Sequence, residues 1–169
     1  TAAGLLSFVY LAFQFSPDSF KERYLAMPDF SYDITGSEFN SATYRLAEWK
    51  SAWMTIKRAP ILGHGIGDDQ RELFRTYEDL GFVEGLKRRY NAHNQFLETM
   101  LSIGLIGLLS LVLMLLAYAS QAWKQKAKLS LAALAFFVLC MLTESVFERA
   151  WAIVLFNLYF PLFLSLPES

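Results

Sequence analysis

This sequence has very few cysteines and histidines and almost no net charge. Its 169 residues include one cysteine and two histidines. A single cysteine forms no disulfide within the chain, which excludes a disulfide-rich secreted fold. His64 and His93 lie far apart, and neither has a partner at the spacing of a zinc site. Magnesium stays open as an alternative only at two pairs of acids, Asp68 with Asp69 and Glu144 with Glu148. Acids at helix starts usually interact with the helix dipole, so we predict no metal and no cofactor.

No strong charge of either sign is present. The 15 Lys and Arg nearly balance the 16 Asp and Glu, which gives a net charge of −1. A nucleic-acid-binding protein normally carries a basic surface, so we predict no nucleic acid partner. The segment GHGIG at residues 63–67 follows no strand and lacks the spacing of a phosphate loop. We interpret it as a plain turn, with the alternative that its glycines let the backbone approach a ligand.

Apolar residues make up 54 % of the sequence and gather towards its two ends. A membrane-spanning helix needs about 20 apolar residues, and we expect membrane segments at 1–15 (a partial helix), 96–120, 129–144 and 145–166. The segments 129–144 and 145–166 form either two spans or one bent element. Ser145 and Glu148 fit the S-x-x-E capping box, which favours a new helix there. The fold class predicted is all-α, a polytopic helical membrane protein. Because residue 1 is not Met, we expect a piece of a longer chain that is inactive alone.

The connections between these segments predict their orientation. Residues 121–128 carry three lysines and no acid, and short basic loops stay in the cytoplasm. Residues 16–95 then form a long loop in the periplasm. Within it, Leu46, Trp49, Trp53 and Ile56 share one helical face, which is typical of an amphipathic helix lying on the bilayer. Pro60 should stop this helix.

The stretch NAHN, residues 91–94, stands at the start of the 96–120 segment. A helix N-terminus offers free N–H groups and the positive end of a dipole, which suits an anion. The same dipole disfavours imidazolium, so His93 stays neutral and able to accept a proton. Asn91 and Asn94 add uncharged donors and acceptors. His93 is therefore a candidate base, although a capping or packing role remains open.

Two cationic groups lie in the long loop. Arg45 either makes a surface pair with Glu48 or grips a phosphate through two parallel hydrogen bonds. Arg88 and Arg89 directly precede NAHN and either bind the same anion or anchor the chain to lipid headgroups.

Ionisable residues also interrupt the last two apolar segments. Glu144, Glu148 and Arg149 lie between the apolar arms. Charged groups near membrane depth are costly and are functional candidates by default. Glu148 is either a functional residue or the capping partner of Ser145.

Several short motifs occur in an order that resembles a known family. They are Arg45-x₃-Trp49, Pro60-x₂-Gly63-x-Gly65-x-Gly67-Asp68, His93-Asn94-x₂-Leu97-Glu98, Gly104-Leu105-Ile106-Gly107, and Thr143-Glu144-Ser145 with Arg149. Together they resemble the C-terminal half of the O-antigen ligase and Wzy-type polymerase family of bacterial membrane glycosyltransferases. The resemblance covers approximately residues 35–166.

The resemblance implies a GT-C-like fold and an inverting, metal-independent glycosyltransferase of the inner membrane. Its donor would be a glycan on undecaprenyl diphosphate, and its acceptor a hydroxyl of a growing glycan or of the lipid A core, at the periplasmic face. Ligase and polymerase are not distinguished. The family's catalytic roles carry over to Arg45 and His93, and a further family arginine is matched to Arg88 or Arg89. Substrate-binding candidates are Arg88, Arg89, Asn94, Glu144 and Arg149.

A non-catalytic alternative is a membrane transport or scaffold subunit of a polysaccharide export system. A transporter should have broken helices and polar residues near the membrane centre. The 96–120 segment has few polar residues, which favours the enzyme.

Overall fold

The computed structural model describes residues 41–165, with side chains for 43–158. The predicted partial helix at 1–15 and the first part of the long loop, 16–40, lie outside these residues. Every regular element within the described range is helical: α3 (Ser41–Ile56), α4 (Asp69–Asp79), α5 (Val83–Arg88), α6 (Gln95–Lys124), α7 (Lys128–Thr143), the short 3-10 helix η1 (Val146–Glu148) and α8 (Ala150–Ser165). The prediction of a helical protein is confirmed for this range.

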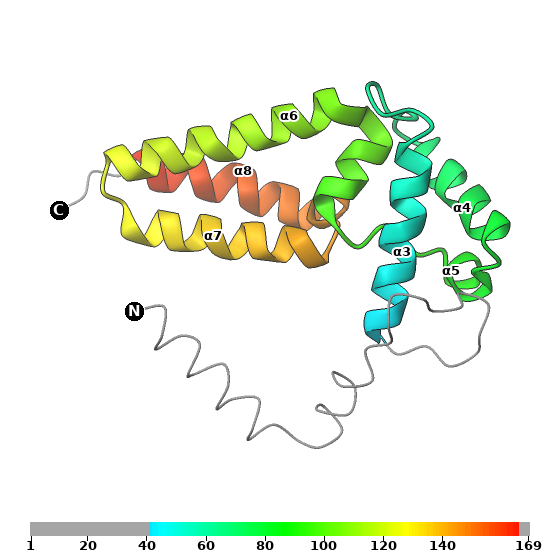
Figure 1. Ribbon diagram of the computed structural model, residues 1–169. Coiled ribbons are helices and arrows are strands. Elements are labelled where there is room, and N and C mark those ends of the chain that lie inside the picture. The colour runs from blue at the N-terminus through cyan, green and yellow to red at the C-terminus, as the bar shows by residue number, and fades with distance from the viewer. Residues whose placement is uncertain (1–40, 166–169) are drawn as a thin grey trace, which may run out of the picture.

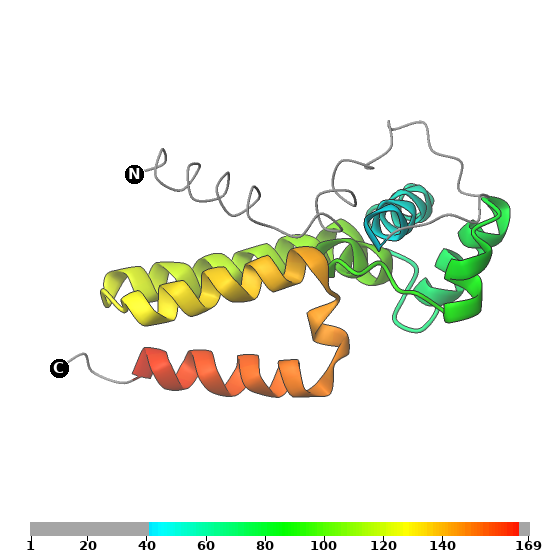
Figure 2. The same cartoon turned by 90° about the horizontal axis from the view of Figure 1, so that it is seen from below.

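The helices form two groups (Figure 1). Helices α3, α4 and α5 gather at one end, where α3 runs across the direction of α6, α7 and α8. Helices α6, α7 and α8 extend away from it, and α6 and α7 run side by side in both views (Figures 1 and 2). Each group has its own core. The first core contains Tyr77, Phe82 and Leu101, and the second contains Phe137 and Phe156.

Helix α3 packs on the protein through a face other than the stripe that was predicted to lie on the bilayer. Its fully buried residues include the small Ala47, Ser51 and Ala52, whereas Trp53 is 50 % exposed. Small side chains let helix backbones approach closely, so this face packs against α4 and α6. The predicted stripe of Leu46, Trp49, Trp53 and Ile56 is thus not the packed face, although Ile56 itself is buried.

Helix α6 is long and apolar enough to cross a membrane, and α7 is apolar but shorter. Large apolar side chains along the group α6–α8 remain exposed, among them Leu109, Leu113, Phe136, Leu139 and Leu158. A soluble protein rarely exposes so much contiguous apolar surface. These helices are therefore suited to lipid, as a helical membrane protein requires.

Helix α6 is broken at Gly104, where φ is 68° and ψ is −158°. The break frees backbone groups on both sides, and the segment 60–65 pairs with them. His64 N donates to Leu101 O at 2.8 Å and Gly65 N to Ser102 O at 2.9 Å. From the other side, Leu105 N donates to Pro60 O at 2.9 Å and Ile106 N to Ile61 O at 3.4 Å. The predicted 96–120 segment is thus not one straight helix.

Glycine is required on both sides of this contact. A Cβ added at Gly104 would lie 2.3 Å from Ile61 O, and one added at Gly63 would lie 2.6 Å from Gly104 N. Of the glycines in GHGIG, Gly63 makes this close approach, whereas an added Cβ at Gly65 or Gly67 meets nothing within 4 Å. The group approached is the backbone of α6.

The capping box predicted at residues 145–148 is wrong. Ser145 makes no side-chain cap, and its hydroxyl instead contacts Glu98 Oε2 at 3.3 Å. The chain forms the single turn η1 before α8 begins at Ala150. This turn brings Glu144 and Ser145 against the start of α6.

Candidate functional site

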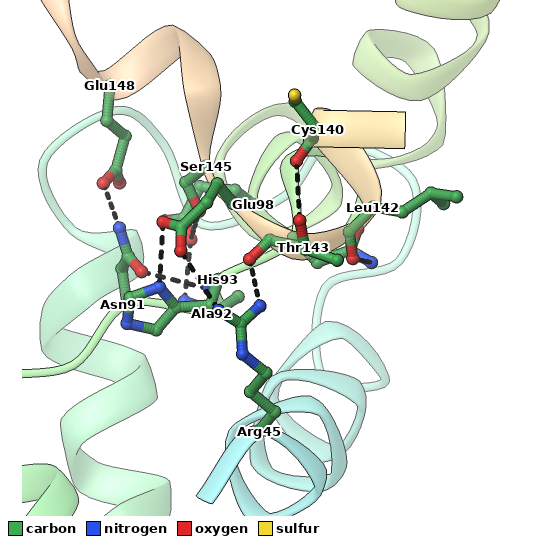
Figure 3. Close-up of polar contacts among 12 residues, drawn as sticks. Arg45, Asn91, Ala92, His93, Glu98, Cys140, Leu142, Thr143, Ser145 and Glu148 are labelled. Atoms are coloured by element: carbon green, nitrogen blue, oxygen red, sulfur yellow. Dashed lines mark hydrogen bonds and ion pairs between the residues drawn. The ribbon is translucent and has the colours of Figure 1, made fainter. Parts of the chain in front are cut away.

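Three segments far apart in the sequence meet at the start of α6 (Figure 3): the first turns of α3, the NAHN stretch and the turn between α7 and α8. Arg45 of α3 donates to Thr143 O and to Glu144 Oε1, the latter at 3.2 Å. The other oxygen of the same carboxylate, Oε2, lies 3.2 Å from His93 Nδ1. Glu144 therefore joins the two residues that were predicted to be catalytic.

The NAHN stretch is held in an unusual backbone conformation. His93 has a φ of 42°, in the left-handed region that side chains other than glycine seldom adopt. Its N–H donates to Asn91 Oδ1 at 3.0 Å, and the Asn91 amide donates to Glu148 Oε2. The ring of Tyr90 packs edge-on against the imidazole at 5.7 Å between centroids. These contacts fix the direction of the His93 side chain.

Asn94 caps α6. Its Oδ1 accepts from the N–H groups of Phe96 and Leu97 at 3.0 and 3.1 Å, and its Nδ2 donates to Leu142 O at 3.1 Å. These bonds occupy donors that the sequence interpretation left free for an anion. Asn94 thus takes up two N–H groups of this helix N-terminus and ties α6 to the end of α7. A role for Asn94 in substrate binding stays a prediction.

Glu98 is a buried carboxyl that holds the parts of the site together through hydrogen bonds. Its side chain is 3 % exposed. Oε1 accepts from Gln70 Nε2 at 3.0 Å, and Oε2 accepts from Ala92 N at 3.0 Å and contacts the Ser145 hydroxyl. One carboxyl thus links α4, the NAHN stretch and the α7–α8 turn.

A second buried carboxyl, Glu48, lies one turn after Arg45 on α3. It is 2 % exposed, and its Oε2 has no hydrogen-bond partner among the described residues. Burial raises the pKa of Glu48 from 4.5 to about 8, although the nearby Arg45 charge opposes the shift. Glu48 is therefore protonated at neutral pH. Arg45 pairs with Glu144 and not with Glu48, contrary to the surface pair considered from the sequence.

An apolar cavity of about 390 Å³ opens beside this cluster, between α7 and α8. Its walls include Phe136, Phe137 and Trp151, and its polar members are Glu144 and Arg149. The cavity thus has two charged residues, Glu144 and Arg149, in an otherwise apolar wall. Arg149 is exposed, and it shares this cavity with Glu144.

The structure places Arg88 and Arg89 differently. Arg88 pairs with Glu84 one turn earlier on α5. The guanidinium of Arg89 lies over the ring of Phe74, 5.2 Å from its centroid. These contacts point both arginines towards α4 and α5, and a role in diphosphate binding stays a prediction.

Sequence reasoning missed Glu48 and Glu98. Both are acids on helices whose neighbouring turns are mainly apolar or small, and an acid in such a setting is a signal of a buried, partnered carboxyl. Among residues 43–158, no three His, Cys, Asp or Glu side chains are grouped so as to hold a metal ion.

Comparisons with known proteins agree with this architecture. The family model described as O-antigen ligase matches residues 1–112. The match includes Arg45, GHGIG, NAHN and Gly104, and ends before Glu144 and Arg149. A protein of Haemophilus influenzae described as uncharacterized is 36 % identical over 89 residues, which are 51 % of this chain and 22 % of that protein. The chain therefore matches about a fifth of that relative's length. No solved structure matches the chain.

Members of the matched family are inner-membrane proteins of polysaccharide assembly. The match covers well over half of the 169 residues and includes two of the three segments that build the cluster at α6, the start of α3 and NAHN. The chain thus belongs to the O-antigen ligase family of glycosyltransferase-like enzymes.

Proposed function

We propose that the cluster of Arg45, His93 and Glu144 transfers a glycan from undecaprenyl diphosphate to an acceptor hydroxyl at the periplasmic face of the inner membrane. The observation that carries this proposal is the contact of one carboxylate with both the guanidinium and the imidazole. A diphosphate leaving group needs positive charge, and an acceptor hydroxyl needs a base. Here the guanidinium and the imidazole that can supply them lie next to each other.

Glu144 defines which nitrogen of His93 does the chemistry. An ionised carboxylate at Nδ1 accepts the proton carried there, so the neutral ring has its lone pair on Nε2. Such a partner orients the ring and stabilises the imidazolium that forms when Nε2 takes a proton. The sequence argument from the helix dipole did not include this carboxylate.

In the proposed reaction, Nε2 of His93 removes the proton of the acceptor hydroxyl. The oxygen attacks the anomeric carbon as the bond from that carbon to the diphosphate oxygen breaks, which inverts the configuration. The bonding electrons leave with undecaprenyl diphosphate. Arg45 uses two of its five N–H donors on Thr143 and Glu144, and the other three are available to the diphosphate oxygens.

The apolar cavity suits the lipid part of this donor. Its aromatic walls accept an isoprenoid chain, and Glu144 and Arg149 stand at its polar edge. A lipid with a charged head requires this juxtaposition, because the chain stays in apolar surroundings while the head reaches the cluster. Arg149 then adds a second cation near the diphosphate.

A transporter would also have a broken membrane helix. In α6, however, four backbone groups beside the break are paired with the segment 60–65. The packing of the segment 60–65 accounts for the break, so the break alone is no argument for a transport path.

The test uses the full-length protein, purified in detergent, with a defined lipid-linked donor and acceptor. Arg45→Lys should lose most transfer while the protein still accumulates, because an ammonium cannot make two parallel bonds to a phosphate. Arg71→Lys is the matched control, since Arg71 makes an exposed pair with Asp68. Near-normal transfer by Arg45→Lys would show that Arg45 is an ordinary surface charge.

His93 variants separate two roles. If His93 is the base, His93→Ala and His93→Gln both abolish transfer and leave donor binding intact, since glutamine has no useful basicity. If His93 only contacts diphosphate, His93→Gln keeps substantial activity and His93→Ala weakens donor binding. Normal transfer by His93→Ala would remove the residue from the site.

A further inference from the structure

A second cavity, of about 410 Å³, lies on another side of the α6 start. It is enclosed by the end of the GHGIG segment, the first turn of α4, the first turns of α6 and the α7–α8 turn. Neither Arg45, His93 nor Glu144 lines it. We call it the polar cavity, because its walls differ in kind from those of the apolar cavity.

The walls of the polar cavity carry three carboxyls, two carboxamides and two hydroxyls, with no Lys, Arg or His. The carboxyls are those of Asp69, Glu98 and Glu148, and the amides are those of Gln70 and Gln95. Such walls repel a phosphate. Carboxylates accept hydrogen bonds from hydroxyls, and carboxamides both donate and accept, so a ligand rich in hydroxyl groups fits them.

A metal ion is a poorer occupant. The described residues contain no group of three acids placed to hold one. The carboxyls are instead fixed by protein donors: Asp69 Oδ1 accepts from Gly67 N at 3.2 Å and Gln70 N at 2.8 Å, and Asp69 Oδ2 accepts from Ser102. Each oxygen has two lone pairs, so Oδ1 of Asp69 is fully used by the protein, whereas Oδ2 keeps one acceptor position for a ligand.

Apolar groups complete the walls. Phe147 and Ile103 line the cavity, and Ile66, which is 86 % exposed, stands at its rim. The C–H face of a sugar ring packs on such groups while its hydroxyls reach the polar ones. Binding sites for small molecules commonly combine apolar walls with a few fixed polar groups in this way, at volumes of about 300–1,000 Å³.

The polar cavity is connected to His93 through very few residues. Glu148, in its wall, accepts from the Asn91 amide, and Asn91 Oδ1 accepts from His93 N at 3.0 Å. Glu98, also in its wall, accepts from Ala92 N. Both contacts end on the NAHN stretch. A ligand in the cavity is therefore linked to the backbone of His93 through Glu148 and Asn91, and it does not touch Arg45.

From this placement we infer that the polar cavity binds a sugar ring, neutral or carrying an amino group, of the glycan that the cluster transfers or extends. The cationic groups of the cluster would then hold the diphosphate on one side of NAHN. The carboxyls and carboxamides of the polar cavity would hold the sugar on the other side. The inference rests on the proposed function for the identity of the glycan.

The experiment uses Ile66→Cys in the full-length protein, because an exposed rim residue tolerates this change without altering the fold. Simple methyl glycosides, a glucoside, a galactoside and a glucosaminide, serve as probes. A bound glycoside should protect Ile66→Cys from a maleimide. At a concentration about ten times its Kd, the modification rate should fall roughly elevenfold, as simple occupancy requires.

Val83→Cys is the matched control, since Val83 is 69 % exposed and lies outside the cavity. The unsubstituted protein gives the background from Cys140. Protection of position 66 alone supports the inference. No protection by any glycoside, or equal protection at both positions, overturns it.

A second measurement separates this inference from the proposed function. Binding of undecaprenyl diphosphate should persist after maleimide blocks Ile66→Cys, and should be lost in Arg45→Ala. If Arg45→Ala binds the lipid normally while glycosides still protect position 66, the proposed diphosphate site fails and the sugar site stands. If lipid binding follows Arg45 but glycosides give no selective protection, the sugar site fails and the proposed function stands.

Discussion

Replacing Gly104 by alanine tests the contact between the segment 60–65 and α6. The backbone at Gly104 has φ 68° and ψ −158°, a region that costs other residues about 1–3 kcal/mol. The added Cβ would also lie 2.3 Å from Ile61 O and 2.5 Å from Gly63 N. Backbone atoms cannot move aside as a flexible side chain does, so we expect the segment to detach.

The size of the effect follows from the bonds that detachment breaks. Four backbone hydrogen bonds join the segment to α6, and each contributes about 0.5–1.5 kcal/mol. A straightened α6 recovers part of this loss, because Leu105 N and Ile106 N can then bond within the helix, and alanine favours a helix by about 1 kcal/mol over glycine. Two of the four bonds are thus regained, and we expect a net loss of about 1 kcal/mol in the free energy of unfolding.

Two controls make the measurement specific. At Gly67, φ is 99° but an added Cβ meets no described atom within 4 Å, so Gly67→Ala reports the backbone cost alone. Gly63→Ala should match Gly104→Ala, since it blocks the same contact from the other side. The double variant should cost little more than either single one, because a contact already lost cannot be lost again.

The assays are denaturant unfolding of the purified full-length protein in detergent and limited proteolysis of residues 60–67. Faster cleavage should accompany the loss of stability in Gly104→Ala and Gly63→Ala. Additive effects in the double variant, or cleavage of residues 60–67 that is no faster in Gly104→Ala than in Gly67→Ala, would refute the account of the break.

Three further predictions concern other parts of the molecule. Glu144→Gln should reduce transfer strongly at unchanged protein level, because an amide stabilises neither the proposed imidazolium of His93 nor the position of Arg45; activity equal to the unsubstituted protein would contradict the proposed link. Glu48 has a pKa of about 8 in the folded protein against an ordinary 4.5, so the folded state binds the extra proton and stability should fall as pH rises from 4.5 through 8. Glu48→Gln should flatten this dependence and be the more stable protein above pH 8, as thermal unfolding across pH would measure. Finally, Gln125→Cys should react with a membrane-impermeant thiol reagent only after cells are opened, since the basic 121–128 loop is expected in the cytoplasm; labelling of intact cells would reverse the predicted orientation.

Local features of the fold were predictable from local sequence. Helix α3 ends at Ile56, shortly before Pro60, and Gly81 follows the last turn of α4 with a φ of 68°. Each boundary depends on the conformational preference of one or two residues, which neighbouring sequence reveals.

Long-range contacts were not predictable in this way. Gly63 and Gly104 require each other, but neither shows its partner through spacing. The same applies to Glu144, whose two oxygens contact residues from α3 and NAHN. Family resemblance identified Arg45 and His93 separately, and only the fold shows the carboxylate that joins them.

The break in α6 also sets how deep the cluster lies relative to a bilayer. From Leu105 to Lys124 the helix has 20 residues (124 − 105 + 1), a length of about 30 Å at 1.5 Å per residue. This equals the hydrocarbon thickness of an ordinary membrane, about 30 Å. The polar residues Gln95, Glu98, Thr99 and Ser102 all precede the break. An unbroken α6 of 30 residues would measure about 45 Å and would tilt or draw these groups into lipid. With the break, the last 20 residues match the bilayer in length, and the proposed function then requires the cluster of Arg45, His93 and Glu144 to lie level with the lipid headgroups.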